Sequence, residues 1–115
     1  MTLAALCISL VTVFAATDNK TDGNGNTIYG SLYGDTKQGQ AKTEYAGSND
    51  SSYVYIEGIS SNGYVINGLV GEATGGVTAY KSITVGTNGT PYTWHSAHGC
   101  KHLSGTSKFA LWITA

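Results

Sequence analysis

The feature that most constrains the fold is a regular rhythm of short segments rich in Tyr, Val, Ile and Thr, separated by Gly, Asn, Asp and Ser. Short segments of this kind, bounded by turn residues at regular spacing, are typical of strands in an all-β sandwich. No segment after the N-terminal stretch has the length of a crossover helix, so a parallel α/β sheet is not expected. We expect a small antiparallel β-sandwich over residues 27–115. The predicted strands lie at about residues 27–34, 40–46, 52–59, 64–72, 77–85, 92–102 and 108–114.

Two Asn-Gly pairs predict turns between these strands. Asn62 and Gly63 in "GISSNGYVI" separate the third and fourth predicted strands, and both residue types tolerate the positive φ of a tight hairpin. Asn88 and Gly89 come before the sixth strand, where Pro91 restricts the entry. The chain therefore carries its turn signals at the places where the strand pattern needs them.

Composition points to an exported protein. Charged residues make up 11% of the 115 residues, against roughly 25% in soluble domains, and 16 are Gly. The length corresponds to one domain. The basic residues are Lys throughout, so the planar Arg forks that read phosphates and guanine edges are missing, and nucleic-acid binding is not expected.

The N-terminal stretch "MTLAALCISLVTVFAA" is uncharged, and it is shorter than the roughly 20 residues that span a membrane. Its Val-x-Ala end, at Val13 and Ala15, predicts a signal peptide over residues 1–15 that is cleaved before Ala16. The alternative is a retained apolar segment used for assembly or anchoring. We expect residues 16–26 to be a flexible lead-in because they are polar and rich in Gly and Asn. The apolar side chains that would act in assembly are Leu3, Leu6, Leu10, Val13 and Phe14.

All three histidines and one of the two cysteines lie within "HSAHGCKH". On a strand, His98, Cys100 and His102 would project to one face, and zinc accepts such nitrogen and sulfur donors. However, same-face residues are about 7 Å apart, so a turn at Gly99 would be needed for them to converge. The competing interpretation is that these histidines, with His95, are polar surface residues late in a strand.

The sequence favours a non-enzymatic protein. It lacks the G-x-S-x-G, phosphate-loop and HExxH motifs, and no acidic residue follows Glu72 to orient the histidines locally. After signal cleavage Cys100 would be the only thiol, and we expect it to be buried rather than bridged to another chain. If Cys7 is retained, a link between Cys7 and Cys100 becomes conceivable.

Alternation in "SSYVYIEG" places Val54 and Ile56 inside and Tyr53, Tyr55 and Glu57 outside. The outward pair Tyr53 and Tyr55 can be interpreted as a binding platform. Tyrosine also favours strands and pairs across them, which explains the same pattern without a ligand.

Several phrases together, "GNGNTIYGSLYG", "SSYVYIEGISSNG", "GGVTAYKSITV" and "HSAHGCKHLSGTSKFALWIT", resemble the small secreted Gly/Ser/Tyr-rich β-proteins of Gram-positive bacteria. Lactococcin-like bacteriocins share this style. The resemblance covers most of residues 24–115, and it carries no catalytic motif. It implies signal-directed export and a β-sandwich, with an antibacterial role as an extension.

The function we expect is that of a small exported module at the cell envelope, acting by surface contact. Its expected partner is a protein or a cell surface, including self-assembly, with no small-molecule substrate and no cofactor. The alternatives are a subunit of an extracellular filament that uses residues 1–16 for assembly, and a bacteriocin-like protein. Glycosylation acceptor triplets, relevant only in a source that glycosylates exported proteins, occur at Asn19, Asn49 and Asn88.

Overall fold

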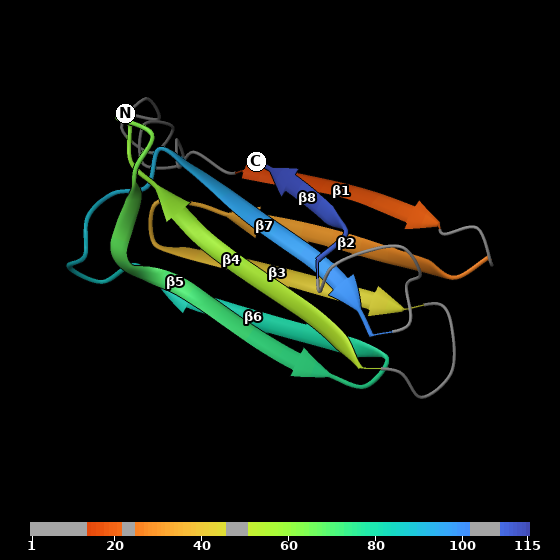
Figure 1. The fold of residues 1–115 in the computed structure, drawn as a ribbon. Coiled ribbons are helices and arrows are strands. Elements are labelled where there is room, and N and C mark those ends of the chain that lie inside the picture. Colours follow the sequence, from red (N-terminus) through yellow and green to blue (C-terminus); the bar gives the residue numbers. More distant parts are fainter. Residues whose placement is uncertain (1–13, 22–24, 46–50, 102–108) are drawn as a thin grey trace, which may run out of the picture.

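The computed structural model describes residues 14–21, 25–45, 51–101 and 109–115 of the chain. It confirms the β-sandwich: eight strands form two antiparallel four-stranded sheets that lie face to face (Figure 1). Sheet A has the order β1-β2-β3-β6, with β1 Phe14–Thr21, β2 Thr27–Gly34, β3 Gln38–Tyr45 and β6 Thr78–Thr84. Sheet B has the order β5-β4-β7-β8, with β5 Val65–Gly75, β4 Ser52–Ile59, β7 Thr93–Cys100 and β8 Leu111–Thr114.

Strand β1 corrects the expectation that ordered structure begins near Thr27. Residues 16–21 of the expected flexible lead-in are instead paired with β2, from Ala16 opposite Leu32 to Thr21 opposite Thr27, and the pairing extends back to Phe14 opposite Gly34. The physical reason is that β1 is an edge strand whose residues are mostly exposed, so it needs no alternation of apolar and polar residues. The count of strands is therefore eight rather than seven.

The predicted turn at Asn62 and Gly63 is confirmed between β4 and β5. Gly63 has φ 84°, which is the left-handed region that only Gly adopts freely. Backbone hydrogen bonds close the turn: the Ser60 N–H donates to the Tyr64 carbonyl at 2.8 Å, and the Gly63 N–H donates to the Ser60 carbonyl at 2.9 Å. The second Asn-Gly pair also lies in the loop before β7, where Gly89 has φ 123°.

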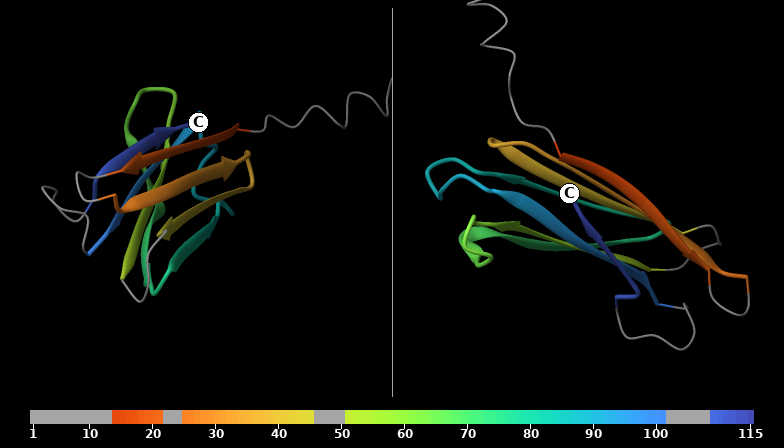
Figure 2. Two further views of the ribbon diagram at one scale, coloured as in Figure 1. Left: turned by 90° about the vertical axis from the view of Figure 1, so that its right-hand side faces the viewer. Right: turned by 90° about the horizontal axis from the view of Figure 1, so that it is seen from above.

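The two sheets form facing layers, which Figure 2 shows from the side and from above. On one side of the sandwich, the short connection from β5 to β6 is held by both sheets. The Gly76 carbonyl accepts from the Ser52 N–H of β4 at 3.0 Å, and the Val77 carbonyl accepts from the Tyr45 N–H of β3 at 2.8 Å. On the other side, β1 and β8 lie next to each other (Figures 1 and 2).

The centre of the core is Trp94 of β7, whose side chain is fully buried. Its indole Nε1 donates to the Asp35 carbonyl at 3.1 Å, so the one polar atom of the ring has a partner. Gly34 and Gly39 face the ring from β2 and β3, and a Cβ at either position would come within 2.4 or 2.6 Å of it. The two glycines therefore provide the space that the indole fills. None of the described residues forms a helix long and apolar enough to cross a membrane.

Candidate functional site

Strand β7 divides the histidine cluster between the two faces of sheet B. His98 is fully buried and Cys100 is buried, whereas the side chain of His95 is 40% exposed on the outer face. His102 lies outside the described residues. The interpretation of these histidines as polar surface residues is therefore wrong for His98, because the inward face of β7 carries it between the sheets.

Both ring nitrogens of His98 have hydroxyl partners inside the sandwich. Nδ1 lies 2.7 Å from Thr43 Oγ1, and Nε2 lies 2.7 Å from Ser96 Oγ. Thr43 donates its one hydroxyl hydrogen to the Tyr53 carbonyl at 2.8 Å, so the His98 Nδ1–H must donate to Thr43. The neutral ring then accepts at Nε2 from the Ser96 hydroxyl. Burial lowers the pKa of His98 to about 4, and the nearby Lys42 backbone, which favours the charged ring, opposes this shift in part.

This network bears directly on the metal interpretation. A zinc ligand needs a free nitrogen lone pair, and the lone pair at Nε2 of His98 already accepts the Ser96 hydroxyl. Within the described part of the chain, no three His, Cys, Asp or Glu side chains are grouped closely enough to hold a metal ion. The arrangement around His98 is instead that of a satisfied buried polar group.

The predicted tyrosine pair lies on the outer face of sheet B, but both side chains are half-buried rather than exposed. The Tyr55 hydroxyl donates to Glu57 Oε2 at 2.5 Å. Burial first, and then Glu57, raises the pKa of Tyr55 to about 12. Glu57 Oε1 lies 3.5 Å from His95 Nδ1, and a pocket of about 140 Å³ lies between these side chains and Trp112, which is 66% exposed. Binding by Tyr53 and Tyr55 remains a prediction.

Larger pockets lie on the other side of the molecule, on the outward surface of β1, β2, β3 and β6, which we call the outer face of sheet A. The strand registers place its side chains in three rows that run across the sheet. The rows are Ala15, Tyr33, Gln40 and Ser82; Thr17, Ser31, Lys42 and Tyr80; and Asn19, Tyr29, Glu44 and Thr78.

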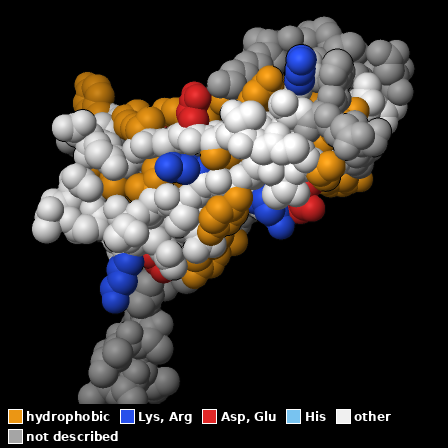
Figure 3. Space-filling view, turned by 90° about the horizontal axis from the view of Figure 1, so that it is seen from below, with side chains coloured by type: hydrophobic (Ala, Val, Ile, Leu, Met, Phe, Trp, Pro, Cys, Tyr) orange, Lys and Arg blue, Asp and Glu red, His pale blue; other side chains and the backbone are white. Residues whose placement is uncertain are grey.

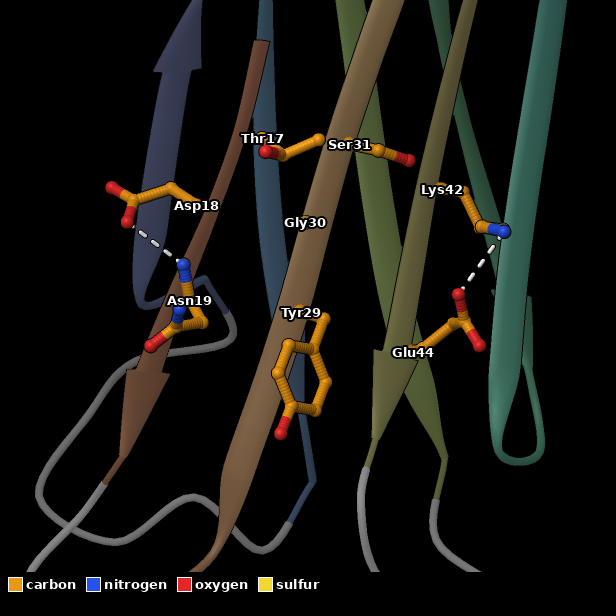
Figure 4. Close-up of a pocket in the computed structure, with 8 residues that line it drawn as sticks. All are labelled: Thr17, Asp18, Asn19, Tyr29, Gly30, Ser31, Lys42 and Glu44. Carbon is orange, nitrogen blue, oxygen red and sulfur yellow. Dashed lines mark hydrogen bonds and ion pairs between the residues drawn. The ribbon is translucent and has the colours of Figure 1, made fainter.

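Two adjoining pockets on this face share Thr17, Ser31 and Lys42. The first has a volume of about 440 Å³ and extends along β2 to Tyr29 (Figure 4). The second has a volume of about 300 Å³ and extends to Tyr33, Gln40 and Tyr80. Because they share a wall, the two pockets together form one depression that is elongated along the strands.

The outer face of sheet A carries little net charge. Lys42 Nζ and Glu44 Oε1 form an ion pair at 3.0 Å, drawn as a dashed line in Figure 4. Asp18 also lines the first pocket, but its side chain points away from Tyr29 at the edge of the sheet (Figure 4). Viewed from below, the molecule likewise shows charged side chains as isolated spots among hydrophobic and uncharged polar groups (Figure 3).

This face could not be assembled from the sequence because its three tyrosines are divided between two strands that are not neighbours. Tyr29 and Tyr33 share one face of β2 by alternation, and that signal was present in the sequence. Tyr80 joins them only through the pairing of β3 with β6, which sets Lys42 opposite Tyr80. The Asn19 side of the depression depends on β1, the strand that the sequence did not predict.

No protein-family model, no curated protein and no solved structure matches this chain. The fold itself defines the class of the chain: a small antiparallel β-sandwich of two four-stranded sheets, one of which has a tyrosine-bearing outer face with little net charge.

Proposed function

We propose that the chain is a small exported, non-enzymatic interaction module of the cell envelope, and that it binds its partner through the outer face of sheet A. The observation that carries this proposal is the pair of adjoining pockets on that face, bordered by Tyr29, Tyr33 and Tyr80. These side chains are 50%, 39% and 50% exposed, and exposed aromatic rings next to pockets are typical of binding surfaces. The apolar N-terminal stretch and the low charge support export.

The placement of the reactive side chains supports a non-enzymatic role. His98 is buried and neutral at physiological pH, and Cys100 is buried. Ser96 points inward and is hydrogen-bonded to His98, so it is not available as a surface nucleophile. Among the described residues, His98 and Cys100 thus have structural positions in the core, and the Ser96 hydroxyl is held by His98 although Ser96 is one of the residues that line the small pocket beside His95.

The test is co-sedimentation of the purified mature protein with envelope fragments from its source. We expect Tyr29→Ala and Tyr80→Ala each to weaken binding about tenfold, because each removes an exposed ring from the edge of a pocket. Trp112→Ala is the matched control, since it removes an even more exposed ring from the outer face of sheet B. Circular dichroism checks that all three variants fold.

The experiment distinguishes binding by the outer face of sheet A from binding by the outer face of sheet B. Binding that survives Tyr29→Ala and Tyr80→Ala but is lost in Trp112→Ala would contradict the proposed surface. It would favour the smaller pocket beside Tyr55 and His95 instead.

A filament subunit is the second candidate, and one observation favours it. The apolar residues 1–13 lead directly into β1, and β1 is an edge strand of sheet A. Edge strands expose unpaired backbone groups that can pair with a strand from another chain. Deleting residues 1–13 should abolish polymer if this candidate is correct, and polymer that persists in electron micrographs would rule it out.

A further inference from the structure

We infer that the outer face of sheet A binds a neutral polysaccharide chain of the cell envelope. This inference rests on the proposed function, because it names the chemical class of the partner for that same face. Sugars present C–H groups on their ring faces and hydroxyl groups around their edges. A complementary protein surface therefore combines exposed aromatic rings with uncharged donors and acceptors.

The geometry of the face fits an extended ligand. Tyr29 and Tyr33 are four residues apart on β2, which places them about 13 Å from each other along the strand. Tyr80 lies on β6, two strands from β2 and in the row of Ser31. The three rings thus surround the middle of the depression, and together the two pockets accommodate more than one sugar ring.

The polar groups between the rings suit hydroxyl recognition. Ser31, Thr17 and Gln40 line the pockets and offer hydroxyl and amide groups that both donate and accept hydrogen bonds. They project from neighbouring paired strands, so their positions are fixed by the sheet before a ligand arrives.

The charges of the face disfavour an anionic ligand. Of the described residues, Lys42 alone brings a cationic side chain to the lining of the two pockets, and Glu44 neutralises it at 3.0 Å. Asp18 adds a negative charge at the edge of the first pocket. Phosphate-bearing and acidic polymers would need uncompensated positive charge, which this surface does not offer.

The apolar content of the face disfavours a protein partner. Protein interfaces usually have an apolar centre that is depleted of charge. Here the Lys42 and Glu44 ion pair lies on β3, one of the two middle strands, and the large hydrophobic side chains exposed on the described part of this face are tyrosines. Among the described residues, the exposed large aliphatic side chains lie on β5 or the connection after it, at Val65, Val70 and Val77.

The experiment uses the mature protein and envelope fragments treated in two ways. Protease digestion removes envelope proteins, and periodate oxidation followed by quenching destroys sugars that carry neighbouring hydroxyl groups. We expect binding to survive protease, to be lost after periodate, and to change little when NaCl is raised from about 0.1 M to about 1 M. Isothermal titration with the protein-free polysaccharide should show about tenfold weaker binding for Tyr80→Ala, and Tyr80→Phe should retain most of the affinity because it keeps the ring.

Other outcomes distinguish the polysaccharide inference from the proposed function on which it rests. Binding that is lost after protease but kept after periodate, and that still depends on Tyr80, would overturn the polysaccharide and leave the interaction surface in place. Envelope binding that is indifferent to Tyr29→Ala and Tyr80→Ala would overturn both. If the protein sediments as a dimer and Tyr80→Ala sediments as a monomer, the face binds a second copy of the chain. That result would also overturn the polysaccharide inference.

Discussion

His98 shows how a buried imidazole is accommodated between the two sheets. Its ring lies against Gly30 of β2, where a Cβ would come within 2.8 Å of it. Its two nitrogens are hydrogen-bonded to Thr43 and Ser96, which are themselves buried. In a protonated ring Nε2 also carries a hydrogen and needs an acceptor. The Ser96 hydroxyl, which donates to Nε2 of the neutral ring, would have to rotate and accept instead. The surroundings therefore favour the neutral ring.

The depressed pKa of His98 predicts that the fold loses stability in mild acid. An unfolded chain protonates this histidine below its ordinary pKa of 6.5, whereas the folded chain does so only near pH 4. The unfolded state thus binds more protons between these values, so the free energy of unfolding should fall as pH drops from about 6.5 to about 4. The full effect of the shift is about 3 kcal/mol. Urea denaturation at pH 7.5 and pH 4.5 measures this loss.

Two variants identify the residue responsible. His98→Gln should reduce the loss of stability between these pH values, whereas His95→Gln, which changes the half-exposed histidine, should leave most of it. Titration of the ring by NMR provides a measurement that needs no variant. A His98 ring that protonates near pH 6.5 in the folded protein would contradict the hydroxyl network.

Trp94 depends on glycines at two positions. A methyl group at Gly39 would come within 2.6 Å of Cε3 and Cζ3 of the indole, and the ring is enclosed by the core. Gly39→Ala should therefore destabilise the fold by about 1–3 kcal/mol through overpacking. Gly76→Ala is the control, because a Cβ there meets nothing within 4 Å. The urea midpoints of both variants can be measured from the fluorescence of Trp94 in a Trp112→Phe background. Equal midpoints for Gly39→Ala and Gly76→Ala would contradict this packing.

Among the elements, β1 is the one that sequence reasoning did not find, and its chemistry explains why. Seven strands were predictable because half-buried strands alternate and Asn-Gly turns separate two of the pairs. In "TDNKT", by contrast, every residue is polar and exposed, so the stretch has the composition of a loop. Its strand conformation comes from pairing with β2, which is a tertiary effect that local preference does not reveal.

The predicted signal cleavage has a consequence for β1. Cleavage before Ala16 would remove Phe14 and Ala15 from the strand and leave Ala16–Thr21 paired with Thr27–Leu32. We expect a protein that begins at Ala16 to fold, with the remaining β1 amides protected in hydrogen exchange because the pairing with β2 persists. A protein that begins at Gly25 lacks β1 and should be less stable, with the Thr17 and Asn19 wall of the first pocket missing. Equal stability of the two proteins would mean that β1 adds nothing to the sandwich.

At the scale of the whole molecule, the candidate binding surface is formed by one face of a sheet rather than by a local motif. The sequence directed attention to the histidine cluster, and the structure places its centre inside the core. The larger candidate surface combines Tyr29, Tyr33 and Tyr80, which are spread over two strands with a third strand between them. Such a surface depends on strand order and register, and alternation within one segment specifies neither. The fold class could therefore be predicted from the sequence, whereas this candidate surface could not.

The proposed partner binds the outer face of sheet A. The most direct measurement is a map of backbone amide shifts by NMR as protein-free envelope polysaccharide is added to the ¹⁵N-labelled mature protein. We predict that the shifts cluster on the residues around the two pockets, above all Ser31, Lys42 and Tyr80, and that those of Trp112 and His95 stay constant. Shifts confined to the Trp112 and His95 side, or no shifts at all, would contradict polysaccharide binding at the outer face of sheet A.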